Sequence, residues 1–167
     1  MAKLWQILIP TVAVLLSGCV GREPGVAAGD KMPGFAVASI KDPVLRIDSA
    51  SYNGRAVLID FWATWCPPCR EELPHIEKLW KDNKDRGLVV MAVTTDDLAT
   101  VAKFRAEQNA QLPMFLDEDR KMSRAFGITG LPTTIVVGKD GNVLYSSIGY
   151  DAGGDAELDA AVAQALL

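Results

Sequence analysis

The sequence predicts an α/β fold in which helices cover a sheet that is partly parallel and partly antiparallel. Residues 57–62 and 88–93 are continuous apolar runs, the pattern of strands that are buried on both faces. Each run is followed by a segment with apolar side chains at helical spacing. Near the C-terminus, Asp140-Gly141 joins two further apolar runs, as expected for a hairpin. Strand, helix, strand, helix, hairpin and helix together indicate an α/β sandwich.

Local signals place the individual elements. The helix after the first buried strand starts near Pro67, and Pro74 inside it is expected to introduce a kink, because its ring opposes the carbonyl of Arg70. Asp96 or Asp97 is expected to cap the next helix. In chain order the expected strands are 35–40, 44–47, 57–62, 88–93, 114–116, 133–137 and 143–148, and the expected helices are 67–86, 97–108, 119–126 and 155–166.

The first nineteen residues differ from the rest of the chain. Lys3 precedes an almost unbroken apolar run at residues 4–16, and about 13 residues fall short of the ~20 that a membrane span needs. The run suits the apolar core of an export signal. Leu16-Ser17-Gly18-Cys19 resembles the lipobox of bacterial lipoproteins, which implies cleavage before Cys19 and attachment of lipid to that cysteine. An uncleaved membrane anchor and a plain signal peptide are the alternatives.

These features divide the 167 residues into three parts. We expect a lipoprotein signal peptide at residues 1–18, a lipid-anchored flexible tether at 19–33, rich in Gly, Pro and Ala, and a folded domain at 34–167. The net charge of −4 and the absence of a long Lys or Arg run argue against nucleic acid as a partner. Lipid attachment would account for the odd one of three cysteines. The domain is expected on the extracytoplasmic (periplasmic) side of a bacterial membrane, where disulfides persist.

The expected chemistry lies at Cys66 and Cys69, which directly follow a buried strand and open a helix. Two cysteines with this spacing can bring their sulfurs to bonding distance, and a helix N-terminus lowers the pKa of a thiol that lies there. Pro67 and Pro68 have no N–H, so the amide of Cys69 is the nearest backbone donor to the Cys66 sulfur. We expect Cys66 to be the exposed nucleophile and Cys69 the shielded resolving thiol.

Other interpretations of the pair fit less well. A structural zinc site needs about four ligands, whereas the pair supplies two and His75 is the sole histidine. Covalent haem attachment needs a histidine after the second cysteine, where this chain has Arg70. A permanent structural disulfide with so short a loop would constrain the unfolded chain little. A peroxidase would need a proline and a threonine or serine where Ile59 and Ala63 stand. A soft-metal carrier that uses the two thiols as ligands stays open.

Two segments carry a family resemblance. Residues 61–74, FWATWCPPCREELP, closely resemble the active-site signature of the TlpA/ResA-like thioredoxin family, and residues 127–134, GITGLPTT, are similar to its cis-proline segment. The resemblance extends from about Phe35 to the C-terminus. It implies a thioredoxin-like three-layer α/β/α sandwich with a mixed central sheet and a strand–helix insertion at residues 96–116. Members of this family are mostly exported or membrane-tethered reductants, several of which serve cytochrome c maturation.

The resemblance also implies which residues meet the substrate. Pro132 would be cis, its loop would face the cysteines, and Leu131 would pair with the substrate chain. An ordinary trans proline at the start of a strand is the alternative. Trp65 and Pro67 are expected at the substrate-facing surface, whereas Trp62 is expected to pack inside.

Two carboxylates are candidates for accepting the Cys69 proton. Asp60 lies inside an apolar strand, where burial should raise its pKa, and it matches the aspartate beneath the second cysteine of thioredoxins. Glu72, one turn after Cys69, matches a glutamate that influences cysteine acidity in ResA-like members. The alternatives are an Asp60 that reaches solvent or a backbone amide, and a solvated Glu72 that faces the helix dipole. His75 is expected to be an exposed helix residue.

The predicted reaction is thiol–disulfide exchange that reduces disulfides in exported proteins. The catalytic residues would be Cys66, Cys69, Asp60 and Glu72, with no metal or organic cofactor. Electrons would come from a membrane thiol donor, and the lipid on Cys19 would hold the protein at the membrane. A disulfide oxidase or isomerase on the same fold is the main alternative, and the reduction potential distinguishes the two.

Overall fold

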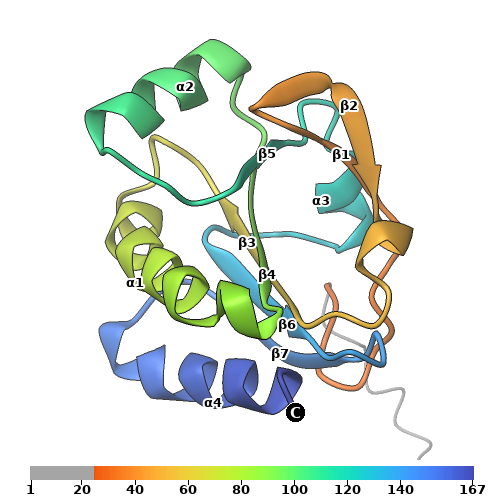
Figure 1. Ribbon diagram of the computed structural model, residues 1–167. Helices are drawn as coiled ribbons and strands as arrows, with labels where there is room; N and C mark the ends of the chain where they lie inside the picture. The colour runs from red at the N-terminus through yellow and green to blue at the C-terminus, as the bar shows by residue number, and fades with distance from the viewer. Residues whose placement is uncertain (1–24) are drawn as a thin grey trace, which may run out of the picture.

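The structure, a computed structural model, describes residues 25–167. Its helices lie on both faces of a single sheet (Figure 1). The strands are β1 (Ala36–Ser39), β2 (Asp42–Asp48), β3 (Val57–Trp62), β4 (Val89–Thr94), β5 (Met114–Leu116), β6 (Thr133–Val137) and β7 (Val143–Ile148). The helices are α1 (Pro67–Asn83), α2 (Leu98–Glu107), α3 (Lys121–Ala125) and α4 (Asp155–Ala165), with short 3-10 turns at Ser49–Tyr52, Lys84–Arg86 and Ala152–Gly154.

The seven described strands form a mixed sheet in the order β2-β1-β5-β4-β3-β6-β7. The central strands β3, β4 and β5 are parallel to one another. Antiparallel strands flank them on both sides, β6 and β7 on one and β1 and β2 on the other. Helix α2 and strand β5 occupy the predicted insertion, and β5 lies between β1 and β4. The sandwich, its mixed sheet and the thioredoxin-like fold are therefore confirmed.

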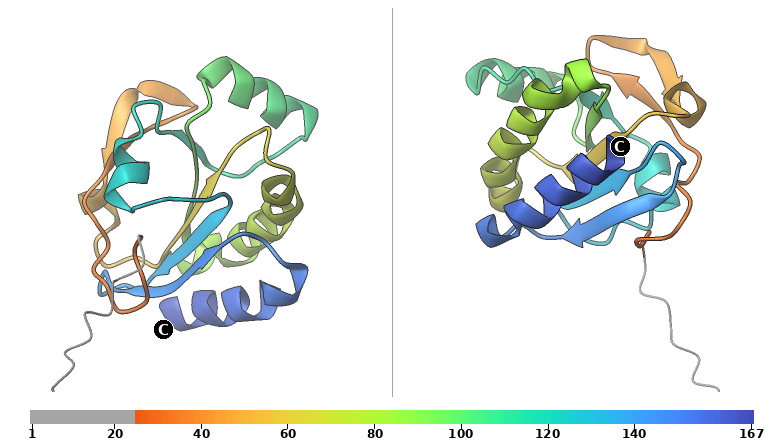
Figure 2. Two further views of the ribbon diagram at one scale, coloured as in Figure 1. Left: turned by 180° about the vertical axis from the view of Figure 1, so that it is seen from behind. Right: turned by 60° about the horizontal axis from the view of Figure 1, so that its bottom comes forward.

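Strand β3 divides the core into two layers. All six of its residues are buried, as its apolar run predicts. Leu58 and Trp62 join the hydrophobic cluster under α1 and α4, whereas Ile59 and Phe61 join the cluster on the side of α3. This alternation follows from the two-residue period of a strand, and it assigns Asp60, between Leu58 and Trp62, to the α1 face. The three views agree that α1 and α4 lie side by side on that face (Figures 1 and 2).

Helix α1 connects the site to this core. It begins at Pro67, continues through Pro74 and buries Leu73, Ile76 and Leu79 against the sheet. The chain leaves this unit at Gly87, whose φ of 99° lies in the left-handed region that glycine adopts without a steric penalty.

Residues 25–33 correct the predicted domain boundary. The Val26 amide donates to the Phe126 carbonyl at 3.2 Å, the Gly29 amide to Val143 at 2.8 Å, and the Met32 amide to Gly141 at 2.9 Å. The folded domain therefore includes residues from 25 onward, although the sequence predicts a tether up to 33. These contacts are made by backbone groups, so a composition rich in Gly, Pro and Ala does not disclose them.

The predicted signal peptide and the lipidation site at Cys19 lie outside the described residues, as does the start of the predicted tether. Across residues 25–167, no helix combines the length and the apolar content that crossing a membrane requires.

Candidate active site

Cys66 and Cys69 form a disulfide at the N-terminus of α1, with their Cα atoms 5.3 Å apart. Cys66 is the N-cap residue, and its sulfur accepts a hydrogen bond from the Cys69 amide at 3.3 Å. This bond confirms the expectation that the two prolines leave Cys69 as the nearest donor. Cys66 is 4% exposed and Cys69 is 0% exposed. Both residues are therefore buried in the disulfide form, contrary to the expectation of an exposed Cys66, and of the two only Cys66 keeps some exposed surface.

A carboxylate from the insertion holds the loop that leads from β3 to the disulfide. The Thr64 amide donates to Asp96 Oδ2 at 2.7 Å, and the Asp96 amide donates to Thr94 Oγ1 at 3.1 Å. Asp97, not Asp96, caps α2, because its side chain accepts from the Thr100 amide. Sequence analysis does not separate the roles of these two adjacent aspartates, since both suit a helix N-terminus.

The Leu131–Pro132 peptide bond is cis, as the family resemblance implies. The Pro132 carbonyl accepts a hydrogen bond from the Gly149 amide at 2.8 Å, and the Thr133 hydroxyl donates to the Gly130 carbonyl at 2.8 Å. These two bonds hold the cis-proline loop, which precedes β6, against the end of β7.

A cavity of about 530 Å³ lies beside the disulfide. Trp65 and Leu131, two predicted substrate-facing residues, both line it, and Trp65 is 71% exposed. Pro67 is also exposed at the surface. Trp62 is buried and packs its ring against Phe104, with 4.9 Å between the ring centroids.

Ile148 is an exposed apolar residue of this region that sequence analysis does not identify. Its side chain lies so close to Gly130 that a Cβ there would be 2.8 Å from Ile148 Cγ2. Glycine at position 130 therefore allows β7 to approach the cis-proline loop. The sequence carries no signal for this contact, because Ile148 fits an ordinary strand.

Asp60 lies on the α1 face of β3 and is fully buried. Its direct partner across the β3–β6 pair is Thr134. Neither Asp60 carboxylate oxygen finds a hydrogen-bond partner within residues 25–167. Burial raises the pKa of Asp60 well above its usual value, and the nearby Glu72 carboxyl raises it further. The alternative of an Asp60 that reaches solvent or a backbone amide is therefore wrong.

Glu72 projects from α1 one turn after Cys69 and is 4% exposed. Its Oε1 accepts a hydrogen bond from the Thr134 hydroxyl at 2.7 Å, while Oε2 has no partner in the described part of the chain. Burial raises the pKa of Glu72, and the Thr134 hydrogen bond acts in the opposite direction. The alternative of a solvated Glu72 is wrong. Sequence analysis misses Thr134, whose importance follows from strand register.

Charged groups on α1 and α4 lie near Glu72 and change its pKa. His75 is half-buried rather than exposed, since its Nε2 lies 2.9 Å from Asp159 Oδ1 and its Nδ1 lies 3.9 Å from Asp155 Oδ2. The charge of Asp155 raises the pKa of Glu72, and His75 lowers it. Helix packing brings these residues together across a long sequence separation, so the motif around the cysteines does not reveal them.

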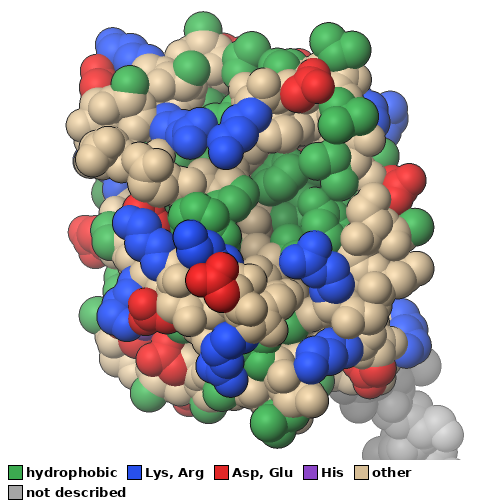
Figure 3. Space-filling model, in the orientation of Figure 1, with side chains coloured by type: hydrophobic (Ala, Val, Ile, Leu, Met, Phe, Trp, Pro, Cys, Tyr) green, Lys and Arg blue, Asp and Glu red, His purple; other side chains and the backbone are tan. Residues whose placement is uncertain are grey.

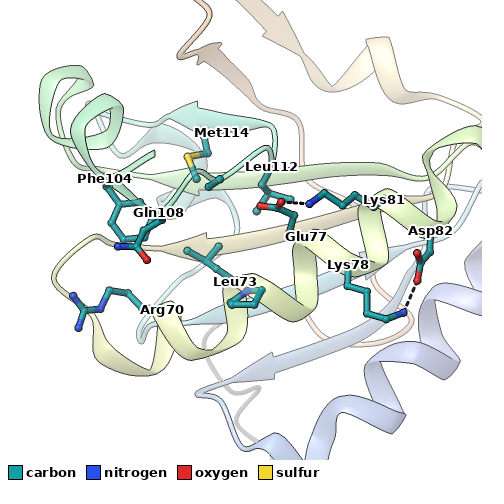
Figure 4. A pocket seen from close by; sticks show the side chains of 12 residues that line it. Arg70, Leu73, Glu77, Lys78, Lys81, Asp82, Phe104, Gln108, Leu112 and Met114 are labelled. Carbon is teal, nitrogen blue, oxygen red and sulfur yellow. Dashed lines mark hydrogen bonds and ion pairs between the residues drawn. The ribbon is translucent and has the colours of Figure 1, made fainter. Parts of the chain in front are cut away.

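A second groove, of about 470 Å³, lies between α1 and α2 (Figure 4). Leu73, Phe104 and Met114 give it an apolar wall, and the rim cations Lys78 and Lys81 pair with neighbouring carboxylates of α1. On the face seen in Figure 1, hydrophobic side chains line a hollow bordered by Lys and Arg side chains (Figure 3). None of the predicted site residues lines the α1–α2 groove. Within residues 25–167, no three His, Cys, Asp or Glu side chains are grouped so as to hold a metal ion.

A thioredoxin-like sheet that presents a cysteine pair at a helix N-terminus defines the class of protein-disulfide oxidoreductases. Residues 27–164 match the Redoxin family. The chain belongs to this family, within which it is a thiol–disulfide oxidoreductase of the TlpA/ResA-like type.

Relatives with this activity cover most of the chain. Thiol-disulfide oxidoreductase ResA of Geobacillus kaustophilus (strain HTA426) is 31% identical over 123 residues, which cover 73% of this chain and 70% of the relative. ResA of Bacillus anthracis is 28% identical over 148 residues, covering 83% and 84%. The crystal structure of a thiol:disulfide interchange protein of the thioredoxin family from Chlorobium tepidum TLS superimposes with a TM-score of 0.71 at 30% identity, covering 85% of this chain and 99% of that one.

Proposed function

We propose that this protein reduces disulfides in exported proteins, with Cys66 as the attacking thiolate and Cys69 as the resolving thiol. The observation that carries the proposal is the position of the pair. Both cysteines lie at the N-terminus of α1, and of the two residues only Cys66 keeps some exposed surface. The positive end of the helix dipole stabilises a thiolate at this position.

The reaction proceeds in two exchange steps. In the reduced protein, the Cys66 thiolate attacks one sulfur of the substrate disulfide, so that a mixed disulfide forms and the other substrate sulfur leaves as a thiolate. Cys69 then loses its proton and attacks Cys66 Sγ, which closes the Cys66–Cys69 disulfide and releases the second substrate thiolate. Two electrons pass from the cysteine pair to the substrate.

Asp60, together with Glu72, is the proposed acceptor of the Cys69 proton. Burial raises the pKa of both carboxyls, and a carboxyl with a raised pKa is the stronger base once it has lost its proton. Glu72 follows Cys69 at the i+3 position, which puts both side chains on the same face of α1.

The substrate chain is proposed to lie across Trp65, Pro67, Leu131 and Pro132. Trp65 and Leu131 line the cavity near the disulfide, and the exposed indole and partly buried leucine side chain suit an apolar segment of an unfolded protein, whereas Pro132 is buried.

We place the reaction on the extracytoplasmic side of a bacterial membrane, with the protein held there by lipid on Cys19. Support comes from the apolar run at residues 4–16 and the tetrapeptide that ends at Cys19. A membrane thiol donor would return the protein to its reduced form. The family resemblance makes apocytochrome c the first substrate to test.

Trapping of mixed disulfides tests the proposal. Cys69→Ser is expected to retain substrate proteins on Cys66 through a bond that dithiothreitol releases, whereas the matched control Cys66→Ser should retain none. Equal retention by the two variants would contradict the assignment of the nucleophile. The direction of the reaction is tested by the reduction potential, which for a reductant should lie near that of thioredoxin, about −270 mV, and not near about −120 mV, as for a strong oxidant.

A further inference from the structure

We propose that the cavity enclosed by β7, the loop 149–151 and α4 is the route by which the buried carboxylate pair exchanges protons with solvent. The inference rests on the proposed function, because it concerns the proton that Cys69 gives up in the resolving step. Each turnover delivers one proton to the Asp60–Glu72 pair. Exchange of that proton with solvent resets the pair without waiting for Cys69 to be reduced again, while the released substrate thiolate takes a proton from solvent.

The cavity measures about 270 Å³ and reaches the Glu72 side chain. Because a water molecule takes about 30 Å³ of liquid, the cavity holds several waters. Glu72 is nearly inaccessible from outside, and its Oε2 is unpartnered in the part of the chain that the structure describes. Oε2 itself has almost no surface open to water in this form, so a water must move from the cavity toward it; such a water would satisfy the buried oxygen and connect it to the exposed residues at the mouth, Asp151 and Glu157.

This cavity is separate from the one beside the disulfide. The residues that line the two cavities do not overlap, and Trp65 and Leu131 belong to the other one. A substrate chain that covers Trp65 and Leu131 would close the shortest path from the cysteines to solvent. It would leave the α4 side open, so the carboxylates stay in exchange with water while the mixed disulfide exists.

The groups that face Glu72 come from four elements. They are Asp60 on β3, the Thr134 hydroxyl on β6, His75 on α1 and Asp155 on α4. Tyr150 lies at the same cavity wall, where burial raises its pKa and the adjacent Asp155 adds to the effect. Asp155 is therefore a positioning residue, since it acts on the reaction through Glu72.

Stopped-flow mixing of the reduced protein with 5,5′-dithiobis(2-nitrobenzoate) separates the two sulfurs. Attack by Cys66 releases one equivalent of thionitrobenzoate, and attack by Cys69 on Cys66 Sγ releases the second. The first phase serves as an internal control, because it transfers no proton to the carboxylate pair. Absence of the second phase in the unmodified protein would contradict the proposed function itself.

Filling the cavity provides the first test. Gly154 lines the cavity, its φ is −84°, and an added Cβ meets nothing within 4 Å. Gly154→Leu should displace water and desolvate Glu72 further, which raises the pKa of Glu72. In a plot of the second-phase rate against pH, the rising limb should therefore move to higher pH. Below that limb the rate should fall about tenfold, within the range that a general base contributes. Gly153→Leu is the matched control, because Gly153 does not line the cavity and its Cβ would make only ordinary contacts. An unchanged pH profile in Gly154→Leu, or an equal shift in the control, overturns the proposal.

A second variant should shift the profile in the opposite direction. Asp155→Asn removes a charge that raises the pKa of Glu72, so the rising limb of the second phase should move to lower pH. Asp85→Asn is its control, since Asp85 is exposed on the 3-10 turn after α1 and does not line the cavity. Opposite shifts in the two test variants support the route, because damage to the fold would slow both alike. A shift of Asp155→Asn to higher pH, or none, overturns it.

Discussion

Replacing Asp60 with asparagine is expected to stabilise the oxidised protein at neutral pH by about 2 kcal/mol. Both carboxylate oxygens of Asp60 are buried, and neither has a hydrogen-bond partner among residues 25–167. A buried polar group without a partner costs about 1–3 kcal/mol, and more when it is charged. Asparagine keeps the shape of the side chain and removes its charge, so the part of the cost that comes from the charge disappears, while the cost of a buried polar group without a partner stays. The adjacent carboxyl of Glu72 adds to the gain, because it opposes ionisation of Asp60.

The effect depends on pH in a defined direction. Burial, followed by the charge of Glu72, raises the pKa of Asp60 in the folded protein above that of the unfolded chain, about 3.9. Below that value Asp60 is protonated in both states, and the unmodified protein has its full stability. As the pH rises from there toward the raised folded pKa, the unfolded chain releases its proton first, and the free energy of unfolding falls. Asparagine does not titrate. The difference in free energy of unfolding between the variant and the unmodified protein therefore grows across this window and then stays constant.

Thermal unfolding of both proteins from about pH 4 to pH 8 measures the difference. A domain of this size shifts its melting temperature by about 3 °C per kcal/mol, so Asp60→Asn should melt about 6 °C higher at pH 8 and nearly the same at pH 4. Asp85→Asn, on an exposed 3-10 turn, is the control for a generic loss of negative charge. A variant that melts lower than the unmodified protein at pH 8, or by the same margin at every pH, would refute the reasoning.

Three further substitutions have separate expected outcomes. Thr134→Val removes the hydrogen bond that lowers the pKa of Glu72, so the second thionitrobenzoate phase should shift to higher pH, and no shift would mean that the bond is without effect. Asp96→Ala frees the Thr64 amide and should lower the free energy of unfolding by about 1–2 kcal/mol in urea titrations; a change below a few tenths would contradict this. Trp65→Ala should raise KM for insulin reduction while stability stays within about 0.5 kcal/mol, and an unchanged KM would remove the indole from the proposed substrate surface.

The fold could be predicted because its signals are local. The apolar run of β3 and the Asp140-Gly141 turn each define an element within a few residues. The packing of residues 25–33 could not be predicted, since backbone amides, which any composition supplies, form much of it, and its apolar contacts come from the isolated side chains of Val26 and Met32. Helix α1 includes Pro74, as predicted, and burial of its apolar residues against the sheet stabilises it.

The cysteine pair could be located from sequence for the same reason. Cys66 and Cys69 are three residues apart, and the start of a helix fixes their geometry. The surroundings of the two carboxylates could not be located in this way. Thr134 reaches Glu72 across 62 positions, and Asp155 and His75 meet only after α4 packs beside α1. Such contacts depend on strand register and helix packing, for which a single sequence carries no local pattern.

The register of the β3–β6 pair therefore determines the surroundings of the two carboxylates in the proposed redox chemistry. Asp60 and Thr134 face the same side of the sheet because they are direct partners in the β3–β6 pair. A slip of one residue would turn every β6 side chain to the opposite face and bring Thr133 or Ile135 opposite Asp60. The hydroxyl that binds Glu72 would then point into the α3 layer, and Glu72 would lose the one hydrogen bond that lowers its pKa. The apolar residues Ile135 and Val137, which belong to the α3 layer, oppose this slip because it would move them out of their cluster. The hydrophobic pattern of β6 thus sets the environment of the carboxylate proposed to act with Cys69.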